Sequence, residues 1–331
     1  MMVYDVSEFA SASSGSVIRL LPQPNDSHPY YADRDVLALV VDAINNQAPL
    51  HISGESGTGK SHFLNSLMFG PITNFFSVCA GLDQNGWNRF TCHRIFISSY
   101  ELPSEVWFKT EVVKFSTVER PQKIMEVLRG CQEDPRSLHI IWLVESGRGV
   151  SPSVQGGFLE IIGQRTIRAP NGEVLEAGNV TFVTDSNHAA NQAGEFAIWD
   201  LDRAYGRRFV RRITLEPLTP IQETLVLREL RPNAPPEQIQ NIVCLAGAIR
   251  AKQREGALVS ILPPSIDAEL DLLDCMSRMG WLKIDTRKLA FSTLLGHCSE
   301  ADREETEDVY GEVFGVRVKT STPAGQAVGI L

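Results

Sequence analysis

Apolar residues follow two different spacings along the chain up to residue 216. Short continuous apolar runs are typical of strands that are covered on both faces of a parallel sheet, and they predict strands at 51–53, 94–98, 139–144, 180–183 and 210–215. Between them, the three-to-four-residue spacing of an amphipathic helix recurs at 33–47, 63–68, 122–132 and 152–163. This alternation predicts an α/β domain with a parallel five-stranded sheet.

Two segments interrupt the alternation. Asn171 and Gly172 lie between 166–168 and 173–175, and this pair is the strongest short signal for a β-hairpin. Segment 103–121 has no regular spacing, so we expect an irregular insertion there.

Past residue 217 the pattern changes, because helical spacing continues without strands between the helices. The helices expected are 220–230, 236–254, 265–280 and 285–298. We therefore expect an α/β core at 30–216 and an all-helical lid domain at 217–299. Residues 1–29 are rich in serine and proline and are expected to form a loose arm, and 300–331 a C-terminal tail.

A glycine-rich motif connects the first expected strand to the helix that follows it. Residues 54–61 have the pattern G-x-x-x-x-G-K-S, and a strand before and a helix after it make the match specific for a phosphate-binding P-loop (Walker A). Lys60 is expected to bridge the β- and γ-phosphates, and the Ser61 hydroxyl to ligate Mg²⁺. The alternative is a glycine-rich turn that caps an ordinary helix. The residues expected to bind the nucleotide are Gly54, Glu55, Ser56, Gly57, Thr58, Gly59, Lys60, Ser61 and His62.

Composition excludes few classes of protein. The formal net charge of −9 over 331 residues argues against a protein that coats polyanions, although a local basic channel is compatible with it. No apolar run approaches the length of a membrane span, so we expect no membrane partner. The six cysteines are scattered, with no C-x-x-C and no histidine at metal spacing, which indicates reduced core thiols and a cytoplasmic location.

Further motifs resemble one family of P-loop proteins. Residues 183–187 (VTDSN) end an expected strand with Asn187 placed for a sensor-1 role, and 202–209 (DRAYGRRF) is similar to an arginine-finger box. The stretch 151–187 and the segment 99–105 (SYELPSE) resemble the MoxR branch of the AAA+ class and its CbbQ and NorQ relatives. The resemblance extends over about residues 30–300.

The resemblance implies a ring-shaped homo-oligomer, usually a hexamer, that binds ATP with Mg²⁺ at each subunit interface. Arg208, with Arg207 as second choice, would then reach the γ-phosphate in the neighbouring subunit and stabilise charge that develops during phosphoryl transfer. The alternative is a solvated basic helix face that pairs with local acids.

The family pattern breaks at the end of the third strand, where an Asp-Glu pair is expected and the chain has 143–147 (LVESG). Without a gap, Glu145 takes the place of the metal-binding Asp and Ser146 that of the catalytic Glu. With one inserted residue, Val144 takes the Asp place and Glu145 is the general base. Either way one carboxylate is missing, and Ser146 is no base at neutral pH without a basic neighbour. The sensor-2 segment, 264–267, also lacks an arginine. We therefore expect ATP binding with slow or no hydrolysis.

Three functions fit these expectations. The first is a chaperone-like remodelling or assembly ATPase that acts on a protein client or with a von Willebrand A-type partner. The second is a nucleic-acid-acting regulator of the transposition, restriction or defence type, whose insertions would present Lys109, Lys114, Arg165 and Arg168 into a pore. The third is a structural ring subunit that never cycles.

Overall fold

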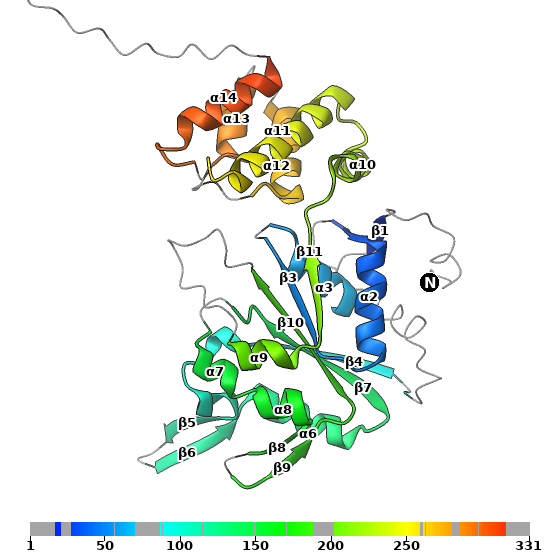
Figure 1. Ribbon diagram of the computed structural model, residues 1–331, viewed down its shortest axis with the longest axis vertical. Helices are drawn as coiled ribbons and strands as arrows, with labels where there is room; N and C mark the ends of the chain where they lie inside the picture. Colours follow the sequence, from blue (N-terminus) through cyan, green and yellow to red (C-terminus); the bar gives the residue numbers. More distant parts are fainter. Residues whose placement is uncertain are drawn as a thin grey trace, which may run out of the picture. The chain divides into compact units, whose positions relative to one another are not determined.

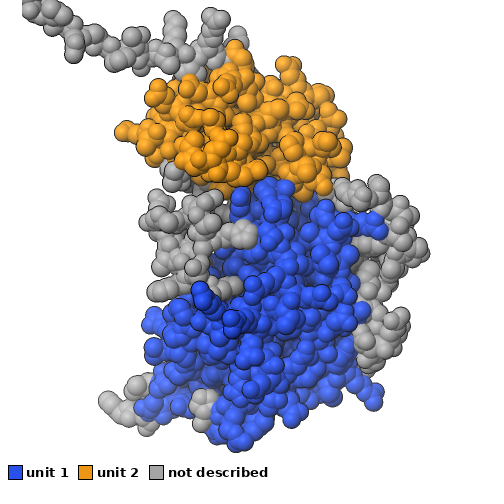
Figure 2. Space-filling view, in the orientation of Figure 1, with its two compact units in different colours: residues 1–217 blue, residues 218–331 orange. Residues whose placement is uncertain are grey.

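The structure is a computed structural model that describes most of the chain. The described residues are 17–20, 28–55, 57–69, 87, 89–113, 116–147, 150–169, 171–187, 202–258, 261, 263–279, 285–296 and 298–315. The chain divides into two compact units, Met1–Pro217 and Leu218–Leu331 (Figure 2). Each unit is described by itself.

The first unit is built around a five-stranded parallel sheet (Figure 1). In spatial order its strands are β11 (Arg211–Leu215), β3 (Leu50–Gly54), β10 (Val180–Asn187), β7 (Ser137–Val144) and β4 (Arg89–Phe96). Counted along the chain, this order is fifth, first, fourth, third, second. The first strand therefore lies between the fourth and the fifth, and its carboxyl end is flanked by theirs. The predicted α/β fold with a parallel five-stranded sheet is confirmed.

Helices cover both faces of this sheet, so the unit has two apolar cores. On one face α2 (Arg34–Asn45) and α3 (Lys60–Phe69) pack against Ile52, Trp142 and Val144. On the other face, helices α6 to α9 enclose Ile141 and Leu143. These four helices are α6 (Lys123–Glu133), α7 (Pro152–Gly156), α8 (Leu159–Gln164) and α9 (Arg203–Arg208). Because β7 is buried on both sides, it reads as a continuous apolar run in the sequence.

Helix 152–163 was expected to be continuous, but it is divided into α7 and α8. Ser151 caps α7 by accepting a hydrogen bond from Val154 N, with Pro152 at the first helical position. The break falls at Gly157, which packs tightly: a Cβ there would lie 3.1 Å from Val106 Cγ2 and 3.2 Å from the Val154 carbonyl oxygen.

Two segments that were expected to be irregular contain strands. Residues 103–121 form the 3₁₀ turn η2 (Pro103–Val106) and a hairpin of β5 (Phe108–Val113) with β6 (Ser116–Pro121). Within the expected N-terminal arm, β1 (Val17–Leu20) pairs with β2 (Tyr30–Asp33), and Leu20 is fully buried. The predicted hairpin at Asn171-Gly172 is present as β8 (Thr166–Arg168) with β9 (Val174–Glu176).

The second unit is helical throughout its described part. Its helices are α10 (Pro220–Leu230), α11 (Pro236–Arg254), α12 (Ile266–Met279), α13 (Thr286–Ser292) and α14 (Arg303–Phe314). Helix α14 lies in the segment expected to be a tail, yet Val309 and Tyr310 are buried in the core of this unit. The acidic residues of its first turn obscured the helical spacing in the sequence. The few apolar residues of the helix complete that core. None of the described helices has the length and apolar character needed to cross a membrane.

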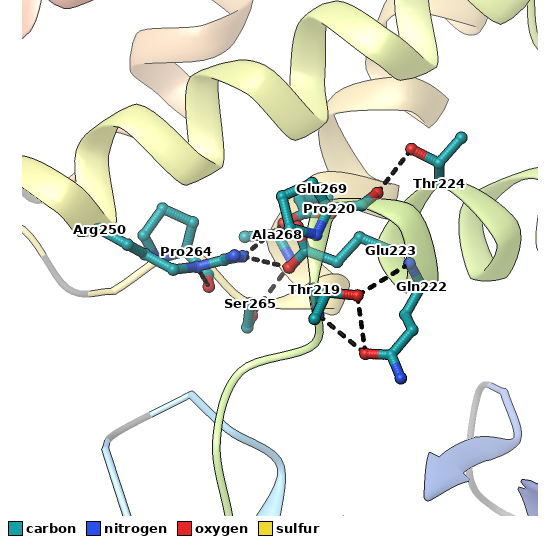
Figure 3. Close-up of polar contacts among 10 residues, drawn as sticks. All are labelled: Thr219, Pro220, Gln222, Glu223, Thr224, Arg250, Pro264, Ser265, Ala268 and Glu269. Carbon is teal, nitrogen blue, oxygen red and sulfur yellow. Dashed lines mark hydrogen bonds and ion pairs between the residues drawn. The ribbon is translucent and has the colours of Figure 1, made fainter. Parts of the chain in front are cut away.

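Three charged side chains are buried together in this unit (Figure 3). The Arg250 guanidinium lies 2.6 Å from Glu223 Oε1 and 2.8 Å from Glu269 Oε1, and its Nε donates to the Pro264 carbonyl. Both carboxylates are nearly inaccessible, and the second oxygen of each has no hydrogen-bond partner among the described residues. One arginine cannot neutralise two carboxylates. Burial, together with the charge of Glu223, raises the pKa of Glu269 to about 8.

This cluster makes the stability of the helical unit depend on pH. A raised carboxyl pKa means that the folded state binds more protons than the unfolded state, so stability falls as pH rises from the ordinary glutamate value of about 4.3 toward 8. Glu269→Gln keeps an acceptor for Arg250 and removes the ionisation. We expect the variant to be more stable than the wild type at about pH 8, by on the order of 1 kcal/mol.

Hydrogen exchange of α11 and α12 in the full chain, corrected for intrinsic rates, measures this effect. Glu237→Gln, an exposed change at the start of α11, is the matched control. Equal pH dependence in the wild type and Glu269→Gln would contradict the assignment.

Candidate nucleotide site

The glycine-rich loop leaves β3 at Gly54 and enters α3 at Lys60. Gly57 and Gly59 have φ values of 85° and 77°, a left-handed conformation that glycine adopts without steric cost. A Cβ on Gly54 would lie 2.6 Å from the Leu215 carbonyl oxygen, so no side chain fits there. The backbone thus has the conformation that a phosphate-binding loop requires. Ser56 lies outside the described residues.

The ammonium group of Lys60 is buried in this loop. Its Nζ donates to the carbonyls of Gly54 at 3.0 Å and Glu55 at 2.7 Å, and the residue is 7% exposed. Burial lowers the pKa of Lys60 to about 8, although the charges of Asp185, Glu145 and Glu55 oppose the shift. The buried positive charge therefore interacts with three acids, Asp185, Glu145 and Glu55.

Aromatic side chains support the loop from one side. The Tyr30 ring covers Gly59, where an added Cβ would lie 2.8 Å from it, and its hydroxyl donates to the Thr58 carbonyl at 3.4 Å. The His62 ring packs against those of Tyr30 and His28, with centroids 5.5 Å and 5.0 Å away. His62, one of the expected binding residues, therefore lies in this supporting cluster, whereas Ser61 is exposed in the first turn of α3.

Strand β10, which pairs with β3, and strand β7, which pairs with β10, bring two of the expected catalytic residues, Asn187 and Glu145, to the carboxyl edge of the sheet. Asn187, the last residue of β10, is in register with Gly54. Glu145 directly follows β7 and is half-buried, with a φ of 51°. A left-handed conformation costs a non-glycine residue about 1–2 kcal/mol. Among the described residues, Gln47 and Arg165 are the other non-glycine residues with such φ values.

Asp185 belongs to the same cluster, although the sequence analysis gave it no role. It is 1% exposed, and its Oδ1 accepts from Trp142 Nε1 at 2.7 Å and from the Glu145 backbone N–H at 3.1 Å. Burial raises its pKa, opposed by these two hydrogen bonds and by the charge of Lys60. Asp185 therefore holds the turn after β7 in place and balances the lysine. Its signal in the sequence was an acid within an otherwise buried strand.

Ser146 occupies the second carboxylate position in the gapless alignment, but its side chain is directed into the core. The hydroxyl is fully buried and hydrogen-bonds to Thr184 Oγ1 and to the Tyr205 hydroxyl, the latter at 3.0 Å. A serine held by two neutral hydroxyls has no basic neighbour to activate it. Ser146 is therefore a structural residue, and it does not replace the missing carboxylate.

Gln155 connects the turn after β7 to α9. Its fully buried amide nitrogen donates to the carbonyls of Ser146 at 3.0 Å and Val150 at 3.3 Å. Its Oε1 accepts from the backbone N–H of Asp202 at 2.7 Å, and Asp202 caps α9. One side chain thus fixes the start of α9 relative to Glu145.

Arg207 and Arg208 end α9 and are both exposed, and neither has a carboxylate partner among the described residues. The Arg208 guanidinium lies against the backbone of α8, where a Cβ on Gly163 would be 2.8 Å from it. The nearby Arg211 pairs with Asp42, and Arg212 donates to the Gly206 carbonyl. Phe209 is buried beside Tyr205, with ring centroids 5.1 Å apart.

The basic residues of the two insertions are mostly held locally. Lys109 pairs with Glu111 on the same strand β5, Arg120 pairs with Glu111 across the β5–β6 hairpin, and Arg165 donates to the Gln47 carbonyl. Arg168 is exposed, and Lys114 lies outside the described residues. Of the basic residues expected to face a pore, Lys109 and Arg165 thus have partners within the described chain.

The chain was compared with protein families, curated proteins and solved structures. No family model matches the chain, and no curated protein matches it. Among solved structures, it is similar to a candidate ATPase from Cytophaga hutchinsonii, with 14% identity, a TM-score of 0.37, and 85% of this chain and 88% of that chain covered. It is also similar to a proline-to-glycine variant of RuvB from Thermotoga maritima, with 12% identity, a TM-score of 0.44, and coverage of 85% and 87%.

Because burial lowers the pKa of Lys60, binding of ATP at this loop would depend on pH. Only the protonated lysine attracts phosphates, and ATP is fully ionised above about pH 7. We therefore expect the affinity for ATP to fall as pH rises past 8, by up to about tenfold per pH unit. Calorimetric titrations across this range measure the effect. Lys60→Gln should bind weakly without this dependence, and Lys288→Gln, an exposed lysine of the second unit, should behave as the wild type.

Proposed function

We propose that the chain is a MoxR-like AAA+ ATPase that binds ATP with Mg²⁺ and hydrolyses it slowly. The observation that carries this proposal is the buried Lys60 at the carboxyl edge of the sheet, within a loop of left-handed glycines and beside Glu145 and Asp185. The spatial strand order supports the proposal. Strand β10, which carries Asp185, lies beside β3, and strand β7, which directly precedes Glu145, lies beside β10.

The residues present fit a triphosphate. The backbone N–H groups of 57–61 and the positive end of α3 would hold the phosphates, and Lys60 would exchange its two carbonyl acceptors for phosphate oxygens. Ser61 and Glu145 would hold Mg²⁺. When bound, the cation would neutralise charge on the phosphates.

Slow hydrolysis follows from the number of usable carboxylates. Glu145 is half-buried and can serve as the metal ligand or as the base, but one group cannot serve fully as both. Asp185 is almost inaccessible and already accepts two hydrogen bonds, so it acts as a positioning residue. A nucleotide that persists would then act mainly as a switch for assembly.

The proposed assembly of subunits rests on the arginines of α9. Two exposed arginines without local carboxylate partners in the described chain suit a role in a neighbouring subunit's site within a ring, such as a hexamer. We therefore favour a remodelling or assembly factor for a protein client or a von Willebrand A-type partner. The nucleic-acid alternative is weakened, because Lys109 and Arg165 are engaged within the chain.

The two acids near Lys60 have separable effects. Glu145→Gln should retain ATP binding and lose phosphate release by about 100-fold or more, because it removes the accessible carboxylate. Asp185→Asn should weaken both ATP binding and phosphate release, since it removes the charge that balances Lys60 and loosens the turn that carries Glu145. Calorimetry and a phosphate-release assay measure the two properties, with Glu160→Gln, an exposed change on α8, as control. Undiminished release in Glu145→Gln would contradict the assignment, and absence of ATP binding in the wild type would refute the proposed function.

The arginines of α9 should act between subunits. Arg208→Ala should lower phosphate release by about 100-fold or more without weakening ATP binding, whereas Arg203→Ala, an exposed change on the same helix, should have little effect. Mixing Arg208→Ala with Lys60→Ala subunits should restore part of the activity, because one partner supplies the loop and the other the arginine. If Arg207→Ala alone shows these effects, the roles of the two arginines are exchanged.

A further inference from the structure

Three metal-binding side chains meet on the face of the sheet covered by α6. His93 lies on the edge strand β4, His139 near the start of β7, and Cys131 on α6. His139 is paired with Thr91, so His93 is its diagonal neighbour on the same face. The nitrogen and sulfur atoms that these residues can offer to a metal all lie within 4.8 Å of one another.

The two histidines already face each other through ring nitrogens. His93 Nε2 and His139 Nδ1 are 3.0 Å apart, and the rings are nearly coplanar, with an interplanar angle of 14° and centroids 5.3 Å apart. Such an in-line pair shares one proton between two nitrogen lone pairs. On its other side, His139 Nε2 lies 3.4 Å from the Asp134 carbonyl oxygen. Metal-binding histidines are usually oriented by a backbone carbonyl in this way.

These distances are close to those of a tetrahedral zinc site. Zn–N bonds of about 2.05 Å and Zn–S bonds of about 2.3 Å at tetrahedral angles place two nitrogens about 3.3 Å apart, and a nitrogen and a sulfur about 3.6 Å apart. The histidine nitrogens need to separate by only a few tenths of an ångström. The Cys131 sulfur must move by at most about 1 Å toward the nitrogens, and rotation of its side chain can supply this movement.

We propose that His93, Cys131 and His139 bind a Zn²⁺ ion, with a fourth position open to the adjacent pocket. This pocket has a volume of about 270 Å³, and Asp134 and Glu126 are among its lining residues. Two imidazoles and one thiolate are ligands that Zn²⁺ prefers, and a carboxylate or a water completes the set. The site would connect edge strand β4 to α6 and β7. It takes no part in the proposed ATP binding.

The charges around the cluster are compatible with this occupant. Burial and the charge of Asp134 raise the pKa of Cys131 to about 12, so the metal must displace the thiol proton, and binding releases protons. Burial, His139 and the nearby Lys123 lower the pKa of His93 to about 4, which keeps its imidazole neutral as ligation requires. Lys123 also lines the pocket, where its charge is partly offset by Glu126, 3.9 Å away.

The full chain, stripped with a chelator and kept reduced, tests the site by titration with Zn²⁺ and with Co²⁺ as a spectroscopic probe. We expect one Zn²⁺ per chain, a rise in the unfolding temperature on binding, and a Co²⁺ spectrum with tetrahedral and thiolate charge-transfer bands. Cys131→Ser should lose the thiolate band and at least about tenfold in affinity, and His93→Gln, at a half-buried edge position, should lose a similar factor.

Cys244→Ser is the matched control, because Cys244 is an exposed free thiol outside the cluster. The wild-type titration does not depend on whether the variants fold. Absence of stoichiometric binding by the wild type would overturn the proposal, as would a thiolate band that Cys244→Ser removes and Cys131→Ser retains. ATP binding by the metal-free chain would leave the proposed function intact in either case.

Discussion

The burial of one positive charge, the ammonium group of Lys60, organises the carboxyl edge of the sheet. Removing an ammonium group from water is costly unless acceptors and opposite charges replace the solvent. The carbonyls of Gly54 and Glu55 accept its hydrogen bonds, and Asp185, Glu145 and Glu55 supply negative charge. Two of these acids come from strands other than β3, so the lysine is stable only if the sheet has formed in this strand order. In the proposed function, Lys60 would exchange these carbonyls for phosphate oxygens.

Features with local signals were predicted from the sequence. The loop was recognisable because its glycines and lysine are consecutive, and the strands because continuous apolar runs such as 139–144 reflect burial on both faces. The helices of the second unit were recognisable from their spacing, except α14, whose charged first turn obscured it. The β5–β6 hairpin lacked the alternation and turn residues that identify a strand pair.

Features that depend on tertiary neighbours were missed for a physical reason. Asp185 gains its role from Trp142 and Glu145 on the adjacent strand, and nothing near it in sequence indicates that contact. The cluster of His93, Cys131 and His139 draws one residue from each of three elements. The spacing rules for metal sites apply to ligands on one loop or helix, so they led us to expect no metal at the cysteines. Strand register, which sequence patterns do not determine, decides both the contacts of Asp185 and the formation of this cluster.

Two sets of hydrogen bonds connect the turn that carries Glu145 to α9, the helix that ends in two arginines. The turn that carries Glu145 continues into Ser146, whose hydroxyl bonds to Tyr205 of α9, while its carbonyl bonds to Gln155, which in turn holds Asp202 at the start of α9. All four of these side chains are buried or half-buried, and each bond is satisfied only in one arrangement. Since Glu145 is held in a strained left-handed conformation, relaxation of that turn would move both ends of the connection together. In the proposed ring, a nucleotide that shifts Glu145 would also shift Arg207 and Arg208, and would thereby link occupancy of one site to the surface presented to the next subunit.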